Sequence, residues 1–358
     1  MTPYDFRYEA LPMRVRFGAG AVSTLGDELS HLGFRRAAVV CTGAEADLAG
    51  RVAGTVCDAV ALVLPDAVMH VPVEAVEAAL DAVIGSAADS LVPVGGGSAV
   101  GLAKAVALQS GLPIVAVPTT YAGSEMTPIW GLTSGGVKRT GRDRRVLPRS
   151  VIYDPDLTLT LPAHVSGVSG MNAIAHAVEA LYAPDGSPIV TLMALEGVKA
   201  LAEALPEVAM TPHDREARAT ALYGAWLCGA CLGSVTMSLH HKLCHALGGA
   251  FDLPHADLHA TVLPYVVAYN APAAPTAMSR LAAALSDGDP ASALWRLGQT
   301  LGAPPSLATL GLTERDVEHV AALAVANPYA NPGPVTEPGV RQLLLAALHG
   351  GEPAPRPA

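Results

Sequence analysis

The feature that most constrains the fold is a regular alternation of short apolar runs and amphipathic segments between residues 35 and 120. The apolar runs have the length of buried β-strands, and the segments between them have the 3.6-residue spacing of helices. The expected strands are 14–17, 35–43, 59–65, 90–95, 112–120 and 151–155, and the expected helices are 21–33, 46–56, 71–88 and 96–111. This alternation predicts a parallel sheet covered by helices, which binds ligands at the carboxyl ends of its strands.

The pattern changes near Pro162, where long Ala- and Leu-rich periodic segments replace the alternation. The expected helices of this second part are 166–182, 188–205, 214–234, 236–248, 274–286, 290–302 and 314–326. A chain of 358 residues is too long for one ordinary core. We therefore predict an α/β dinucleotide-binding domain with a parallel, Rossmann-like sheet over 1–157, an all-α substrate domain over 158–350, and a disordered tail over 351–358.

Composition narrows the classes of partner and compartment. The net charge is −10 and no basic tract carries interleaved aromatic residues, which argues against nucleic acid. No apolar run reaches the roughly 18 residues that a membrane span needs, and no apolar signal core follows the N-terminus. The five scattered cysteines fit a reducing cytoplasm, and Cys228 and Cys231 are expected to be buried small residues.

Two loops at expected strand ends could hold a nucleotide. The first is a run of three glycines, which lets the backbone approach a phosphate, although a tight turn into the next helix explains it as well. The second is the hydroxyl-rich PTTYAGSE over 118–125. Together they favour a cofactor site formed by Gly95, Gly96, Gly97, Ser98, Thr119, Thr120 and Ser124.

The end of the expected strand 35–43 bears on which nucleotide is bound. Sites specific for NAD place an acid near such an end to hold the ribose 2′-OH. Here the chain reads Cys41-Thr42-Gly43, with no acid. We therefore place Thr42 beside the cofactor and predict that NADPH is accepted as well as NADH.

Basic residues gather in the Gly-rich segment 131–155 of a chain that is acidic overall. They are Lys138, Arg139, Arg142, Arg144, Arg145 and Arg149. Two interpretations stay open: a solvated loop or subunit contact, or a position near an anionic ligand such as a cofactor phosphate or a carboxylate substrate.

Histidines are concentrated in the stretch from Leu239 to His255. His241 and His245 are four residues apart and lie on one face if the segment is helical. Gly248 and Gly249 are expected to end that helix, after which His255 can return alongside. Upstream, Asn172 and His176 are also four apart. Two helices that each present two polar side chains inward form either a metal site or a polar pocket.

Several motifs occur in a characteristic order: GGGS with Lys104, PTTYAGSE, VIYDP, GMNAIAHAVEALYA and HHKLCHALGGAFDLPHADLHATVLP. In this order they resemble the iron-containing alcohol dehydrogenase family, whose fold is shared with dehydroquinate synthase. The resemblance implies four metal-ligand positions, which here are Asn172, His176, His241 and His255. It also implies that His245 lies beside the nicotinamide.

The sequence departs from that family at two positions. Asn172 stands where the family has an aspartate ligand, and Gly101 stands where GGGSxxDxxK has its aspartate. An amide oxygen is a neutral, weak ligand, so we expect no bound metal. These departures, with MHVPVE, GRDRRVLP and NPYANPGPVTEPGVRQLL, resemble the maleylacetate reductases, a metal-independent branch. This resemblance implies a homodimer that reduces the C=C bond of maleylacetate to 3-oxoadipate with NADH or NADPH, in aromatic degradation.

A dianionic enone gives each polar residue an expected role. His241, His245 and His255 would line the substrate, with His176 and Asn172 behind or beside them, and one basic residue, Lys242 or an arginine, would hold a carboxylate. Tyr329 could reach the site or pack its loop, His240 stays open, and His70 and His259 are expected to be structural. The alternatives are a metal-dependent alcohol dehydrogenase that tolerates Asn172, a non-catalytic nucleotide-binding sensor, and a dehydroquinate synthase-like lyase.

Overall fold

The computed structural model describes residues 6–11, 13–135 and 137–353, and the chain divides into two compact units. The α/β unit is Ala10–Leu161, and the helical unit combines Pro162–Ala358 with Met1–Glu9. The division follows Leu161, close to the predicted change from strand alternation to helices. Of the tail predicted to be disordered, residues 354–358 lie outside the described residues.

The α/β unit is built on a six-stranded sheet in which every neighbouring pair is parallel, as the alternation predicted. Its strands are β1 (Arg14–Phe17), β2 (Ala37–Val40), β3 (Val60–Leu64), β4 (Ser90–Gly95), β5 (Val115–Pro118) and β8 (Ser150–Tyr153). Their order is β1-β8-β5-β4-β2-β3. The chain therefore passes from β2 outward to β3, returns to β4 on the other side of β2, and continues to β5. The topological switch point lies between the carboxyl ends of β2 and β4.

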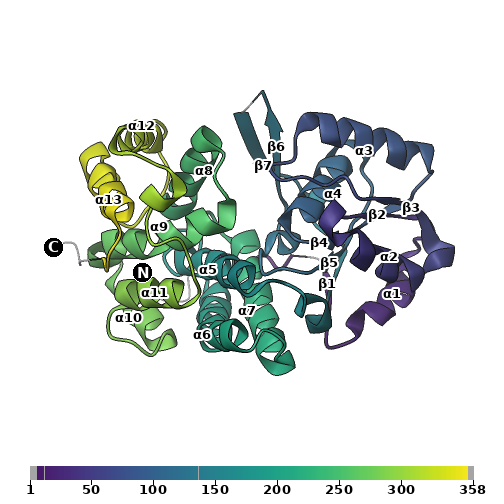
Figure 1. Ribbon diagram of the computed structural model, residues 1–358, viewed down its shortest axis with the longest axis horizontal. Coiled ribbons are helices and arrows are strands. Elements are labelled where there is room, and N and C mark those ends of the chain that lie inside the picture. Colours follow the sequence, from purple (N-terminus) through teal and green to yellow (C-terminus); the bar gives the residue numbers. More distant parts are fainter. Residues whose placement is uncertain (1–5, 12, 136, 354–358) are drawn as a thin grey trace. The chain divides into compact units, whose positions relative to one another are not determined.

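Helices cover both faces of this sheet (Figure 1). They are α1 (Leu25–Leu32), α2 (Ala46–Gly54), α3 (Val73–Gly85) and α4 (Gly97–Ser110). Alternate strand residues such as Val39, Val92 and Val94 pack with Leu29 of α1 and Val52 of α2 in one buried cluster. The inner strands β2, β4, β5 and β8 are buried on both faces, which is why they read as continuous apolar runs in the sequence.

The basic segment forms a hairpin rather than the loop that its Gly-rich composition suggested. Strands β6 (Ile129–Ser134) and β7 (Val137–Arg142) pair antiparallel. At Gly141 a Cβ atom would lie 2.6 Å from the Trp130 ring, so the glycine leaves room for the indole across the pair. Cross-strand packing of this kind is not visible in local composition, and it overrides the turn-like character of the sequence.

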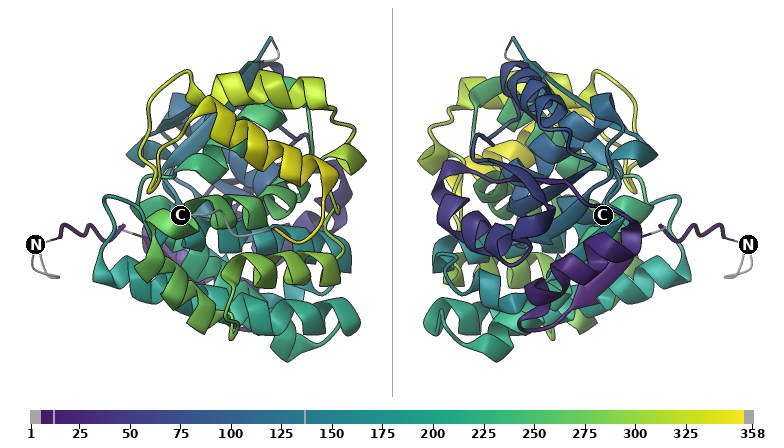
Figure 2. Two further views of the ribbon diagram at one scale, coloured as in Figure 1. Left: turned by 90° about the vertical axis from the view of Figure 1, so that its left-hand side faces the viewer. Right: turned by 90° about the vertical axis from the view of Figure 1, so that its right-hand side faces the viewer.

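The rest of the chain is helical, as predicted. The helices are α5 (Ala163–Ala180), α6 (Pro188–Met210), α7 (Arg215–Ser234), α8 (Leu239–Phe251), α9 (His255–Asn270), α10 (Pro275–Ala284), α11 (Pro290–Thr300), α12 (Glu314–Val325) and α13 (Glu337–His349). Helices α9 and α13 were not predicted. Helix α9 contains Pro264, a residue that disfavours a helix interior, yet its flanking residues are buried. Helices α12 and α13 lie side by side (Figure 2, left).

The expected end of α8 at the glycine pair is wrong. The helix continues through Gly248 and Gly249 to Phe251 and ends at Asp252, whose φ of 52° is left-handed. Each glycine costs about 1 kcal/mol in a helix interior. Burial of Leu247 offsets that cost by about 1.5–3 kcal/mol, and the partly buried Phe251 adds further apolar contacts with the core.

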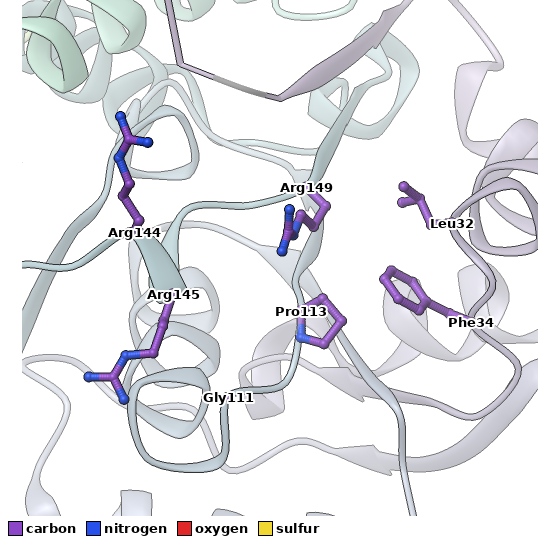
Figure 3. Close-up of a pocket in the computed structure, with 7 residues that line it drawn as sticks. All are labelled: Leu32, Phe34, Gly111, Pro113, Arg144, Arg145 and Arg149. Atoms are coloured by element: carbon purple, nitrogen blue, oxygen red, sulfur yellow. The ribbon is translucent and has the colours of Figure 1, made fainter. Parts of the chain in front are cut away.

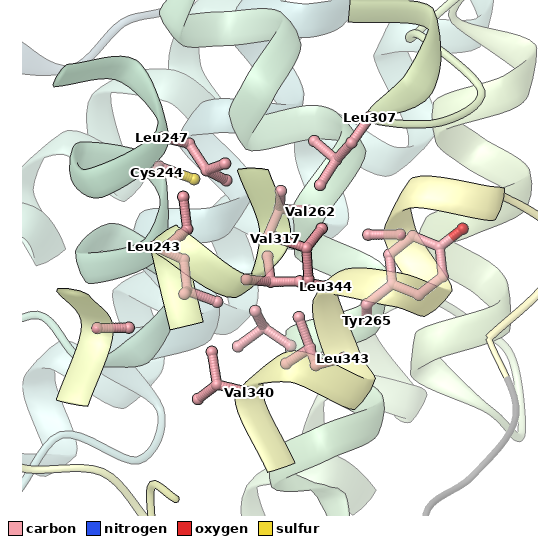
Figure 4. Close-up of a cluster of buried hydrophobic side chains, with 14 of the residues drawn as sticks. Leu243, Cys244, Leu247, Val262, Tyr265, Leu307, Val317, Val340, Leu343 and Leu344 are labelled. Carbon is pink, nitrogen blue, oxygen red and sulfur yellow. The ribbon is translucent and has the colours of Figure 1, made fainter. Parts of the chain in front are cut away.

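One side of α8 is fixed by the apolar core of the helical unit. Leu243, Cys244 and Leu247 are fully buried and belong to a cluster with side chains of α9, α12 and α13 (Figure 4). The residues recur at helical spacing, so their burial orients the whole helix. The predicted burial of Cys228 and Cys231 on α7 is also confirmed, since both are 0% exposed.

No single helix in the described part of the chain is long and apolar enough to cross a membrane. Helices α7 and α8 pass that test of length and composition only as a pair, and they are bent by 94° at their break.

Candidate active site

Helix α5 presents three buried polar side chains on one face. Asn172, His176 and Glu179 follow each other at spacings of four and three residues. They are 4%, 3% and 0% exposed. Asn172 and His176 were predicted from the sequence, but Glu179 was not, although all three lie in the motif GMNAIAHAVEALYA.

The Glu179 carboxylate binds the first turn of α8. Its Oε1 accepts the backbone N–H of His240 at 2.7 Å, and its Oε2 accepts that of Ser238 at 2.9 Å. The first N–H groups of a helix have no partner within the helix, and its positive end favours an anion. The carboxylate therefore fixes the start of α8 against α5, and it positions the histidine that follows.

That histidine is His241, whose Nδ1 lies 2.7 Å from Glu179 Oε2. Burial acts to raise the pKa of Glu179, but the nearby His241 charge and the bonds from His241 and Ser238 outweigh it, so the pKa is lowered and the carboxylate stays ionised. The His241 Nδ1 therefore carries a proton and donates it to this carboxylate. Its Nε2 is buried and has no hydrogen-bond partner among the residues that the structure describes.

The structure brings the predicted histidines into one cluster. The ring centroids of His176 and His241 are 5.1 Å apart, and those of His241 and His245 are 6.3 Å apart. His255 does return alongside, stacked on His245 at 6.3 Å. His245 is exposed and His255 is half-buried, so these two rings form the accessible side of the cluster.

His240 and His259 form the buried side. Both are 0% exposed, their rings lie 4.8 Å apart, and the His240 Nε2 lies 3.2 Å from the His259 carbonyl oxygen. Burial, reinforced by neighbouring histidines, lowers the pKa of His240 to about 4 and the pKa values of His259 and His176 well below the ordinary value. These three rings are therefore neutral at pH 7.

Lys242 and Tyr329, the two residues predicted to bind substrate, lie together. The Lys242 Nζ is 5.6 Å from the centroid of the Tyr329 ring, a cation–π distance. The loop that carries Tyr329 is tied to the start of α8, because the Ser238 hydroxyl lies 2.7 Å from the Ala330 carbonyl oxygen and 2.8 Å from Asn331 Oδ1. Burial, and then the charge of Glu179, raises the pKa of Tyr329 to about 12.

The quartet at the family's ligand positions fits a divalent iron ion poorly. Buried polar atoms without a partner among the described residues include Asn172 Oδ1, His176 Nδ1 and His241 Nε2, and none of these donors is anionic. Within the described residues, the group of His, Cys or acidic ligand atoms that converges within 4.8 Å is instead His240, Cys244 and His259, on the buried side of the cluster.

In the α/β unit, the glycine turn after β4 has the geometry of a phosphate-binding loop. Gly95 has φ +148°, which L side chains rarely adopt, and a Cβ at Gly96 would lie 2.8 Å from Thr120. Gly97 opens α4, which has no side-chain cap at its start, and the first N–H groups of a helix have no partner within the helix. The Thr119 N–H donates to the Gly95 carbonyl at 3.2 Å, so the two predicted cofactor loops meet.

An acid does lie at the end of β2, against the expectation drawn from Cys41-Thr42-Gly43. Glu45 ends a short 3₁₀-helix, and its carboxylate turns back to the strand end. The Thr42 hydroxyl donates to Oε2 at 2.8 Å, and the Thr119 hydroxyl donates to Oε1 at 2.9 Å. Glu45 was not predicted, because a turn whose path cannot be read from the sequence separates it from the strand.

The buried Lys104 side chain supports the second predicted cofactor loop, residues 118–125. It is 1% exposed, and its Nζ donates to the carbonyl oxygens of Ser124 at 2.6 Å, Thr127 at 2.7 Å and Ile129 at 2.9 Å. Ser98 lies in the first turn of α4, next to the glycine turn. Lys104 is therefore a structural support for the loop that carries Ser124.

Three arginines of the basic segment lie at the amino-terminal ends of the sheet strands, opposite the glycine turn. A pocket of about 370 Å³ is lined by Leu32, Phe34, Gly111, Pro113, Arg144, Arg145 and Arg149 (Figure 3). These residues surround the points where β2, β5 and β8 begin, whereas the glycine turn follows the end of β4. For Arg144, Arg145 and Arg149, the interpretation as contacts of a cofactor phosphate at that turn is therefore wrong.

Gly101, the second departure from the family pattern, is also explained by packing. A Cβ at Gly101 would lie 2.9 Å from Val71 Cγ2. Val71 itself has a positive φ of 49° and is buried. An aspartate at position 101 would have to displace Val71, because the valine side chain occupies the space next to Gly101.

A parallel α/β unit with a glycine turn at its switch point, followed by a helical unit with a histidine cluster, defines an oxidoreductase of the dehydroquinate synthase-like fold. The chain belongs to the iron-containing alcohol dehydrogenase family. Residues 12–155 match the model of iron-containing alcohol dehydrogenase, and residues 167–348 match the C-terminal model of the Fe-containing alcohol dehydrogenase family.

Individual relatives are similar over nearly their whole length. The chain is 56% identical to a maleylacetate reductase of Sphingobium indicum, with 98% of this chain and 99% of the relative covered. It is 53% identical to a maleylacetate reductase of Burkholderia cepacia, with 98% and 99% covered. The crystal structure of maleylacetate reductase from Agrobacterium tumefaciens is 48% identical, with a TM-score of 0.94 and 99% and 100% covered.

Proposed function

We propose that this protein is a maleylacetate reductase that reduces the C=C bond of maleylacetate to 3-oxoadipate with NADH or NADPH. The observation that carries the proposal is the Glu179–His241 pair, in a ligand quartet without a carboxylate. His241 Nε2 in this pair has no partner among the residues that the structure describes. The names of the relatives at 56% and 53% identity give the substrate.

The reaction needs stabilisation of an enolate rather than of an alkoxide. When bound, the nicotinamide would supply a hydride to the alkene carbon β to the ketone, and the π electrons would move to the ketone oxygen. A proton then joins the α carbon, so that one hydride and one proton are added across the C=C bond. Because the enolate is delocalised, a hydrogen-bond donor can replace the metal that stabilises an alkoxide in alcohol dehydrogenases.

We assign that donor role to His241. With a proton at Nε2 the ring donates to the developing oxyanion, while the Glu179 carboxylate at Nδ1 balances the imidazolium charge. One well-placed donor of this kind is worth about 10²–10³ in rate. The His176 ring is neutral, and its centroid lies 5.1 Å from that of His241. Together with Asn172 it adds polar groups to the site without adding charge.

The accessible side of the cluster suits a dianionic substrate. Lys242 is half-buried above the Tyr329 ring, and its ammonium would hold one of the two carboxylates. His245 and His255 supply further donors next to it. A hydroxyl or ketone substrate without a carboxylate would leave Lys242 without a counter-ion.

We further propose that the enzyme works without a bound metal, as a cytoplasmic homodimer. The donor set supports the first point, because Asn172 offers only a neutral amide oxygen. The resemblance to maleylacetate reductases supports the dimer. Cysteines without disulfides, at Cys41, Cys57, Cys228, Cys231 and Cys244, support a reducing compartment.

The test is oxidation of NADH with maleylacetate as substrate, followed by absorbance, with and without a strong chelator. The expected result is turnover that the chelator does not change, with a metal content far below one ion per chain. Turnover of simple alcohols that the chelator abolishes would instead identify a metal-dependent alcohol dehydrogenase. Light scattering measures the proposed dimer independently.

A further inference from the structure

We propose that Glu45 is the residue that selects the nucleotide: its carboxylate accepts the hydroxyls of the adenosine ribose and excludes a 2′-phosphate. The inference rests on the proposed use of a nicotinamide dinucleotide and narrows it to a preference for NADH. It reverses the expectation that NADPH is accepted as well as NADH, which depended on the absence of an acid after β2.

Glu45 lies just after the carboxyl end of β2. The residue ends the 3₁₀-helix Gly43–Glu45, directly after β2. Its carboxylate reaches across the end of β4 to the Thr119 hydroxyl, which follows β5. The side chain therefore spans the switch point between β2 and β4, where open α/β sheets bind their ligands.

The Glu45 carboxylate lies against the glycine turn after β4. A Cβ at Gly95 would lie 2.5 Å from Glu45 Oε2, so the carboxylate rests directly on the backbone of the turn. The two threonine hydroxyls, at 2.8 and 2.9 Å, hold one carboxylate oxygen each. The acid is thus fixed before any ligand arrives, and little rotamer entropy is lost when a ribose binds.

The negative charge of Glu45 favours a ribose diol over a 2′-phosphate. Among the described residues, Glu45 has no ion pair, and its two recorded hydrogen bonds come from neutral hydroxyls. A carboxylate is an acceptor only, and each oxygen retains a lone pair for one hydroxyl of a vicinal diol. A 2′-phosphate has a charge of about −1.5 to −2 at pH 7 and would meet this anion at close range. Arg144, Arg145 and Arg149 lie where β2, β5 and β8 begin, at the opposite ends of the strands, and so do not offset this charge.

The experiment compares binding of ADP-ribose and its 2′-phosphate by calorimetry, together with kcat/KM for NADH and NADPH. The variants are Glu45→Gln, which keeps the size and removes the charge, and Asp47→Asn, a matched loss of charge at an exposed position two residues further on. Wild type should bind ADP-ribose at least about tenfold more tightly than its 2′-phosphate. Glu45→Gln should reduce that ratio about tenfold by improving the phosphate form, while Asp47→Asn leaves the ratio unchanged.

Equal affinity of wild type for the two ligands overturns the proposal. So does a Glu45→Gln variant that weakens both ligands by the same factor, because Glu45 would then only support the turn. A thermal melt checks that the variant is folded. Since calorimetry needs no maleylacetate, failure of the proposed reaction with this binding preference intact would be recognised separately.

Discussion

The Glu179 carboxylate and the His241 imidazole lie 2.7 Å apart, Oε2 to Nδ1, and the same carboxylate accepts the backbone N–H that precedes this histidine. The orientation of the ring is thereby linked to the start of α8. A carboxylate that holds both the helix end and the ring cannot be changed without effects on stability and on chemistry. Substitutions can separate the effect on stability from the effect on chemistry.

Glu179→Gln should lower kcat by up to about 10²–10³, the value of the donor that it positions, with a smaller change in KM. The amide cannot balance the charge of an imidazolium, so the donor that faces the oxyanion is weakened. The measurement is a kcat profile over pH with maleylacetate and NADH.

A structural loss would look different. Removal of charged hydrogen bonds to two backbone N–H groups costs roughly 1.5–3 kcal/mol each in stability, visible as a lower Tm. Glu203→Gln, at an exposed position of α6, is the matched control and should change neither quantity. A Glu179→Gln enzyme with reduced Tm but the wild-type kcat profile would mean that the carboxylate only caps α8.

His241→Ala should lower kcat by about 10²–10³, because the oxyanion loses its nearest fixed donor. His245→Ala should lower kcat/KM, since this exposed ring lies on the accessible side of the cluster. His319→Ala, exposed on α12, serves as the control. Wild-type rates for both His241→Ala and His245→Ala would refute the assignment of the site.

Lys242→Gln should raise KM for maleylacetate by about tenfold, with little change in kcat. This is the loss of about 1.4 kcal/mol that one charge-assisted contact contributes to binding. Lys199→Gln removes an exposed lysine from α6 and should leave KM unchanged. Because the contact is between opposite charges, KM of the wild type should also rise with ionic strength more steeply than KM of the variant. The opposite pattern, an unchanged KM with a fallen kcat, would place Lys242 away from the carboxylates.

Local periodicity explains which parts of the site could be predicted from the sequence. His241 and His245 are four residues apart in one helix, and the turn after Asp252 is short enough to bring His255 back. The parallel sheet followed in the same way from apolar runs bounded by glycine turns. In each case the signal lies within about twenty residues of the chain.

The two acids were missed because their roles depend on tertiary contacts. Glu179 is on the same helical face as His176, but its function appears only when α8 begins against it, through bonds that span 59 to 62 residues. Glu45 reaches Thr119, 74 residues away in the sequence. The continuation of α8 past Gly249 has the same origin, since the packing of Phe251 is not encoded in the local glycine signal.

Acid should destabilise the helical unit over a defined range of pH. Burial lowers the pKa of His240 from 6.5 to about 4. Between these values the unfolded chain binds a proton that the folded chain does not, so stability falls as the pH falls from 6.5 and levels off below 4. His240 alone accounts for about 3 kcal/mol, at roughly 1.4 kcal/mol per pKa unit.

The measurement is urea unfolding at pH values from 7 to 4. His240→Gln removes the titrating group, so its stability, although lower at pH 7, should fall less steeply over this range than that of the wild type. His213→Gln, at an exposed position, should keep the wild-type slope. His176 and His259, whose pKa values burial also lowers, add to the slope that remains in the variant. A wild type whose stability is flat between pH 6.5 and 4 would show that these rings bind protons in the folded state.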